Sequence, residues 1–175
     1  MEIPLHAIVV HFPIIITFIL PVLILVFALM IRAKHMNPVS WLVIVGLSMF
    51  VTGAGYFALE TGETEEHRVK DIVAKNLVHE HEEAGEIFVG STVLVLVVGI
   101  AAFFIRRENQ FQLQMMVLLL SLLSGYFAYR SGKLGGELVY AHGAAEAYKV
   151  NIEQMGILPT PGQNTSESPF PVEEE

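Results

Sequence analysis

Long apolar stretches alternate with short polar ones along this chain. Four segments, at residues 7–31, 41–59, 87–105 and 111–129, contain no Asp, Glu, Lys or Arg, and each has 19 residues or more. At about 1.5 Å of rise per helical residue, the shorter segments span about 28 Å, close to the thickness of one hydrocarbon core. The pattern therefore predicts an all-α membrane protein, folded as a bundle of four transmembrane helices in the lipid bilayer.

Composition supports this prediction and divides the chain in two. Hydrophobic residues make up 53% of the sequence and charged residues only 16%, whereas soluble domains have about 25% charged residues. We expect residues 1–155 to form the transmembrane domain. The closing stretch 156–175, "GILPTPGQNTSESPFPVEEE", is rich in Pro, Ser and Glu, which is typical of a disordered, acidic external tail.

Basic residues predict the orientation in the membrane. The two short connections contain Arg32, Lys34, Arg106 and Arg107, whereas all acidic residues except Glu108 lie elsewhere. Short loops rich in Lys and Arg stay in the cytoplasm. Both termini are therefore expected outside, which for a bacterial inner membrane is the periplasmic side.

Six of the seven histidines fall on the predicted outer side, and the helical period distinguishes two of them. With 100° per residue, His81 lies on a stripe of apolar and small residues, while His79 and the neighbouring glutamates lie opposite. His81 is therefore predicted to face the bundle. Gly85, one turn further on, would leave a flat backbone surface where a planar ligand can approach.

A short internal repeat suggests a partner for His81. "GYFALETG" at 55–62 and "GYFAYRSG" at 125–132 match at an offset of 70 residues. The same offset places His11 on His81, which predicts two tandem helix pairs with facing histidines. On one continuous helix His6 and His11 would point about 140° apart, and Pro13 is expected to bend the helix beside His11.

Two histidines on facing helices near one membrane surface are the ligands that a b-type haem requires. We expect His11 and His81 to bind the iron, His6 to support them or to form a second site with His142, and Arg130 to meet a propionate. Aromatic residues and glycines would line the gap; those expected to do so include Phe12, Tyr56, Gly85, Phe88 and Tyr126. The predicted function is electron transfer near the outer face, with a cytochrome or another redox subunit as partner.

The absence of cysteine excludes covalently attached haem, iron–sulfur clusters and disulfides. Two other classes stay open: a zinc or iron site built from His6, His11, His81 and His142, and a structural subunit of a respiratory assembly. The sequence identifies no catalytic residue. It contains neither a Gly-rich phosphate loop nor a basic patch for nucleic acid.

Two stretches resemble the domain-of-unknown-function 2231 family: "LHAIVVHFPI" near the start and "SGKLGGELVYAHG" at 131–143. The resemblance spans residues 5 to about 145 and implies a predicted membrane protein of four helices. Family members that neighbour or are fused to cytochromes imply a haem or electron-transfer role. Ala7 replaces an expected proline. The matching positions are His6, His11, Pro13, Gly135, Gly136, Tyr140, His142 and Gly143.

Overall fold

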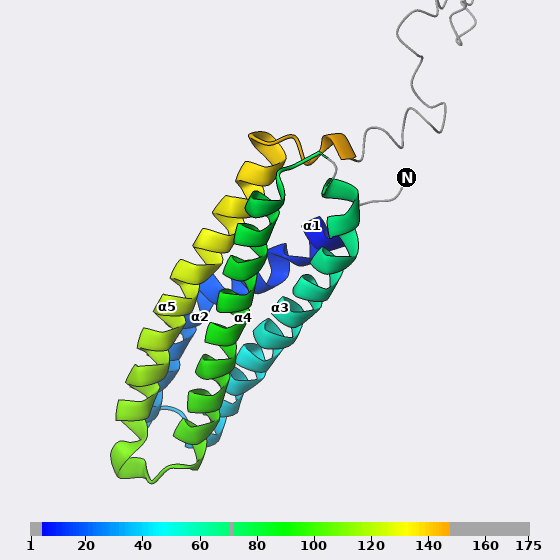
Figure 1. The fold of residues 1–175 in the computed structure, drawn as a ribbon. Coiled ribbons are helices and arrows are strands. Elements are labelled where there is room, and N and C mark those ends of the chain that lie inside the picture. The colour runs from blue at the N-terminus through cyan, green and yellow to red at the C-terminus, as the bar shows by residue number, and fades with distance from the viewer. Residues whose placement is uncertain (1–4, 71, 148–175) are drawn as a thin grey trace, which may run out of the picture.

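The structure, a computed structural model, describes residues 5–70 and 72–147. Its elements are α1 (Leu5–Val9), α2 (His11–Arg32), the 3₁₀ helix η1 (Pro38–Trp41), α3 (Leu42–Val69), α4 (Lys75–Phe104) and α5 (Arg107–Tyr140). The four long helices run side by side as a bundle (Figure 1), and each is long and apolar enough to cross a membrane. The predicted all-α, four-helix fold is confirmed. The predicted tail at 156–175 lies outside the described residues.

The two ends of the bundle differ in composition. The connections between α2 and α3 and between α4 and α5 lie at one end, here called the tryptophan end because Trp41 lies there (Figure 1). Helix α1, the connection from α3 to α4 and residues 141–147 lie toward the opposite end, here called the histidine end. The basic residues of the two short connections therefore gather at one end, as the sequence predicts.

Three helices continue beyond their charge-free segments at the histidine end. Helix α3 extends to Val69, α4 already begins at Lys75, and α5 continues to Tyr140. Side-chain pairs one turn apart support these polar extensions, with Lys70 Nζ 2.8 Å from Glu66 Oε1 and Lys133 Nζ 3.5 Å from Glu137 Oε1. The helices are therefore longer than the charge-free segments at this end, because solvated helix turns carry no apolar signal.

The four long helices form a ring in which α2 and α4 each contact both α3 and α5. A small cavity in the middle of the bundle shows how the first helix pair, α2 and α3, corresponds to the second pair, α4 and α5. Its lining residues are Thr17 and Leu20 of α2, Thr92 and Val95 of α4, Ser48 and Val51 of α3, and Ser121 and Ser124 of α5. Adding 75 to the number of an α2 residue gives its counterpart in α4. Adding 73 to the number of an α3 residue gives its counterpart in α5. The two pairs thus repeat the same buried positions.

This register differs from the offset of 70 that the GYFA match suggested. Under the offset of 75, the counterpart of His81 is His6 rather than His11. The buried positions of α3 and α5 follow the offset of 73, as with Ile44 and Val117, because packing decides which turn faces inward. A short identity between two apolar helices can be displaced by about one turn without changing either hydropathy pattern.

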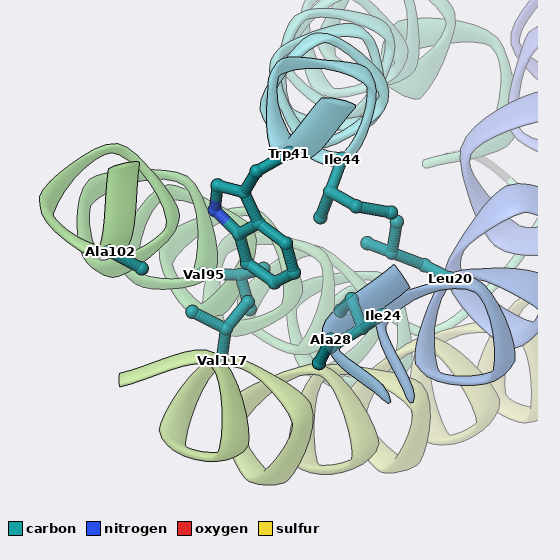
Figure 2. Close-up of a cluster of buried hydrophobic side chains, with 8 residues drawn as sticks. All are labelled: Leu20, Ile24, Ala28, Trp41, Ile44, Val95, Ala102 and Val117. Carbon is teal, nitrogen blue, oxygen red and sulfur yellow. The ribbon is translucent and has the colours of Figure 1, made fainter. Parts of the chain in front are cut away.

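Large side chains close the tryptophan end. The Trp41 indole is fully buried among Ile24, Ile44, Val117 and their neighbours (Figure 2). Its Nε1 donates a 2.9 Å hydrogen bond to the Gly99 carbonyl oxygen, so the polar atom of this apolar cluster is satisfied. This end of the bundle is a packed core that fixes the helices relative to one another.

Candidate functional site

Two histidine side chains meet at the histidine end of the bundle. The ring centroids of His6 on α1 and His81 on α4 are 6.0 Å apart, and the ring planes stand at 80° to each other. The two residues come from different helix pairs and occupy equivalent positions in the repeat. The structure therefore brings together two of the predicted site residues, in a different combination from the one that the sequence favoured.

The His6 side chain is oriented by helix α3. Its Nδ1 lies 2.8 Å from the Ala58 carbonyl oxygen, and this contact is a hydrogen bond in the tautomer that carries the proton on Nδ1. The His6 backbone N–H donates to Glu65 Oε1 at 3.3 Å. In this tautomer Nε2 keeps its lone pair, so a nitrogen of a defined ring orientation is available as a ligand.

His81 lies inside the bundle, as its helical face predicted. Its Nδ1 is buried and has no hydrogen-bond partner, and the ring interacts with the backbone of Ser131 on α5. His79 lies on the opposite face, with 76% of its side chain exposed and its Nδ1 3.5 Å from Glu82 Oε2. An unpartnered buried nitrogen is costly, so His81 is the polar group at this end that a ligand would stabilise most.

Each imidazole packs against a glycine of the helix that completes its own pair. A Cβ atom added to Gly62 of α3 would lie 3.1 Å from His6 Cε1, and one added to Gly135 of α5 would lie 3.0 Å from His81 Cε1. Both distances leave too little space for a methyl group without displacement of the ring. Gly62 and Gly135 are thus needed for the close approach of the rings to the backbone, and they also follow the offset of 73.

The other predicted ligands do not join this pair. His11 begins α2 and His142 lies in the turn after α5; both are exposed, as is Arg130. Among the described residues, no group of three His, Cys, Asp or Glu side chains comes close enough to hold a metal ion. Of the four histidines predicted as ligands, only His6 and His81 are neighbours.

The surroundings of the pair correct two further expectations. Gly85 is buried, but a Cβ added there would lie 2.9 Å from Leu59 Cδ2, so the glycine permits close packing of α3 and α4 and leaves no open surface. The exposed fractions of the Phe12, Tyr56 and Tyr126 side chains are 57%, 59% and 59%, so these rings point away from the bundle. They lie on the outer faces of their helices, and Phe88 is the expected aromatic residue that is buried.

Sequence analysis did not single out Ala58 or Gly62 as contacts of a histidine. A backbone carbonyl acceptor has no side-chain signature, so the role of Ala58 could not be read from residue types. Gly62 closes the repeated GYFALETG stretch, which was the available signal. Gly135 was marked by the family resemblance, although its contact with His81 was not expected.

Hydroxyl groups line the bundle below the histidine pair but do not continue it as a polar site. Thr17, Ser48 and Ser121 donate hydrogen bonds to carbonyl oxygens of their own helices, at 2.7, 2.8 and 2.8 Å. Ser124 donates to the Ser91 hydroxyl at 2.8 Å, which links α5 to α4. These groups satisfy one another and the backbone, so the candidate site is limited to the histidine end.

Comparison with known families supports the fold and the extent of the domain. The family model described as "Predicted membrane protein (DUF2231)" matches residues 2–147. The chain belongs to the DUF2231 family. No curated protein and no solved structure matches it.

Membership in DUF2231 connects the two stretches that carried the resemblance. In this DUF2231 protein, His6 of the first stretch and Gly135 of the second both lie at the imidazole pair. Tyr140 and His142 are exposed near the end of α5, the former to 91%. The DUF2231 description states a membrane location and no activity, so the chemistry of the site must be argued from its geometry.

Proposed function

We propose that this protein is a membrane-embedded b-type haem protein that passes electrons at the histidine end, with His6 and His81 as the axial ligands of the iron. The observation that carries the proposal is the imidazole pair itself. Two imidazoles that each bind one metal ion at about 2.0–2.1 Å have ring centroids about 5 to 6.5 Å apart. The observed 6.0 Å separation and the 80° angle between ring planes suit this arrangement.

The hydrogen bonding of each ring also favours metal ligation. Ligating histidines usually bind a backbone carbonyl or carboxylate through the other ring nitrogen, as His6 does with Ala58. A metal bond would satisfy the buried, unpartnered nitrogen of His81. Because the chain has no cysteine, the haem would be held by these bonds and by packing alone. When bound, its iron would accept and release one electron.

Charges around the histidine end suit the remaining parts of this function. Arg130 is exposed on α5 one residue before Ser131, whose backbone contacts the His81 ring, and is the proposed partner of a propionate. Glu80, Glu83 and Glu86 form an exposed acidic face on α4, which favours approach of a basic soluble cytochrome or another redox subunit. Mutation of these glutamates should slow electron delivery and weaken its dependence on salt.

We also propose that the histidine end faces the outside, which in a bacterium is the periplasm. This orientation is supported by the gathering of Arg32, Lys34, Arg106 and Arg107 at the tryptophan end. Fusion of alkaline phosphatase and of a fluorescent protein after residue 147 tests it. Phosphatase activity without fluorescence is expected, and the reverse result would contradict the orientation.

A bare metal ion is the second candidate, and the 6.0 Å separation of the two ring centroids favours it. An ion fits between two imidazoles at this separation without any further gap, and zinc or iron would complete its coordination with water. The chemistry would then be metal binding without a chromophore. Metal analysis of the same purified protein separates the two candidates, since stoichiometric metal without a Soret band would replace the haem proposal.

The test is an optical spectrum of the protein purified from cells supplied with haem, oxidised and then reduced with dithionite. The wild type should show a low-spin bis-histidine spectrum. His81→Ala should lose most of the haem, and His6→Ala should lose the low-spin species. His79→Ala, on the same helix as His81, and His11→Ala, at the start of the helix that follows α1, are the matched controls and should keep the wild-type spectrum. Equal losses in the controls would contradict the assignment of His6 and His81.

A further inference from the structure

Two arginines meet at one corner of the tryptophan end, where α2 ends and α5 begins. The Cζ atom of Arg32, the last residue of α2, lies 4.3 Å from the centroid of the Phe111 ring of α5. Arg107 is the first residue of α5 and precedes Phe111 by four residues, so their side chains are neighbours on one face of that helix. The fold therefore brings Arg32 and Arg107, from two different helices, to the same ring.

The Phe111 ring holds the Arg32 guanidinium group without using its hydrogen-bond donors. A guanidinium group over an aromatic face is attracted by the electrons of the ring. Its N–H groups lie in its own plane and stay available for an oxygen ligand. Within residues 5–70 and 72–147, no carboxylate forms an ion pair with Arg32 or Arg107. The protein thus positions two positive charges at this corner and leaves them unneutralised.

The rest of this end adds to the positive charge. Lys34 and Arg106 lie in the two short connections, and these two side chains, like those of Arg32 and Arg107, are exposed. Glu108 is the only carboxylate within residues 32–41 and 104–110. An anionic partner is therefore attracted to the tryptophan end, whereas the acidic residues of α3 and α4 repel it from the histidine end.

Phe104 supplies an apolar surface beside these charges. It is the last residue of α4, two residues before Arg106, and is 79% exposed. In a chain that spans the bilayer, the end of an apolar span lies where the hydrocarbon meets the headgroups. A molecule bound here therefore meets positive charge on the headgroup side and an aromatic ring on the hydrocarbon side. A free phosphate ion could use only the first of these surfaces.

We propose that this corner of the tryptophan end binds an anionic phospholipid, with its phosphate group between the guanidinium groups of Arg32 and Arg107 and an acyl chain beside Phe104. The planar guanidinium group can donate two parallel N–H groups to phosphate oxygens. The surrounding positive charge favours a headgroup of net negative charge over a zwitterionic one, whose ammonium group it repels. The site requires no group bound at the histidine end.

Lipid titration of the protein purified in detergent tests this proposal, with bound lipid counted by native mass spectrometry. The wild type should bind phosphatidylglycerol about tenfold or more tightly than phosphatidylcholine, because two arginines contribute. Arg32→Gln and Arg107→Gln should each weaken phosphatidylglycerol binding about fivefold, the effect of one basic residue near anionic headgroups. Lys75→Gln, which removes one exposed positive charge at the start of α4, is the control and should leave binding unchanged.

Two further variants distinguish a shaped site from a simple excess of charge. Glu108→Gln removes the carboxylate of this end and should tighten phosphatidylglycerol binding. Arg32→Lys keeps the charge but lacks the planar group that stacks on Phe111 and donates two parallel bonds. Its affinity should therefore lie between those of the wild type and of Arg32→Gln. Thermal unfolding in the same detergent checks that each variant is folded.

Three outcomes would overturn the proposal. The first is equal affinity for the two lipids, and the second is an equal loss of affinity in Lys75→Gln and Arg32→Gln. The third is displacement of the lipid by inorganic phosphate at the same concentration, which would identify a site for a free anion. None of these measurements requires haem or a metal ion, so their outcome is separate from that of the proposed function.

Discussion

His6 and His81 occupy equivalent positions in the two helix pairs, but only one of them lies on a continuous helix. The difference comes from one residue of the repeat. Under the offset of 75, the counterpart of Pro13 is Phe88. Because Phe88 has a backbone N–H and no ring joined to its backbone nitrogen, α4 continues through this position without a break. A repeated framework can thus present two identical donor groups while one proline separates one of them from the long helix of its pair.

The largest expected effect comes from moving the proline to the second pair. Phe88→Pro should remove a hydrogen bond from α4 and destabilise the protein by about 3 kcal/mol more than Phe88→Ala does. The alanine variant is the control for the lost buried ring, which is 5% exposed in the wild type. Thermal unfolding in detergent measures both. Equal stability of the two variants would show that continuity of α4 does not matter.

The next effect concerns the glycines beneath the rings. Gly135→Ala should cost about 1–3 kcal/mol, since the new methyl group meets His81 at 3.0 Å and α4 cannot yield. Gly62→Ala should cost less, because α1 can move away with His6. The matched control is Gly136→Ala, where nothing lies within 4 Å of the added atom and a gain of up to about 1 kcal/mol is expected. A larger cost at Gly62 than at Gly135 would reverse the comparison.

Pro13→Ala should join the two helices of the first pair with a smaller change in stability, within about 1 kcal/mol. The new N–H can bond the Val9 carbonyl, so amide hydrogen exchange over residues 9–13 should become slower. Because a continuous helix points His6 in a new direction, the low-spin haem spectrum should also weaken. Unchanged exchange would indicate that another feature breaks the helix.

The smallest effect concerns the bond that joins α4 to α5. Ser124 donates to Ser91, whereas the equivalent positions of the first pair are Val51 and Ile16, which cannot form a hydrogen bond. Ser124→Ala should therefore destabilise the protein by about 0.6 kcal/mol, the average for such bonds between membrane helices. Ser40→Ala removes a hydroxyl group from η1, outside the four long helices, and is the control. Thermal unfolding is again the measurement.

The sequence predicted the fold because apolar length and the helical period are local signals. Four charge-free segments specify four spans, and the inward face of His81 follows from its neighbours at helical spacing. These local signals could not decide whether His6 or His11 lies next to His81. Both lie in the same apolar region, and which one meets His81 depends on the break at Val10 and on the register between the two helix pairs.

The register illustrates why the rest of the site could not be derived. The four matching letters of GYFA gave an offset of 70, but the inward-facing turns are set by contacts such as those of Thr17 with its neighbours around the cavity. Likewise, a glycine such as Gly85 suggests an open backbone surface when only the sequence is known. The packing of Leu59 in the structure shows that the space beside it is filled. Tertiary contacts between distant helices decide these points.

The separation of the imidazole pair from the packed Trp41 core also has an electrical consequence. In a bilayer the apolar spans of the four helices would lie in the low-dielectric layer across which a membrane voltage falls, and moving one elementary charge through the whole layer is worth about 2.3 kcal/mol per 100 mV. A charge that reaches His6 and His81 from the histidine end crosses little of this layer. Chemistry at the pair should therefore proceed almost equally in energised and de-energised membranes, which a redox titration in vesicles under an imposed potassium diffusion potential would measure.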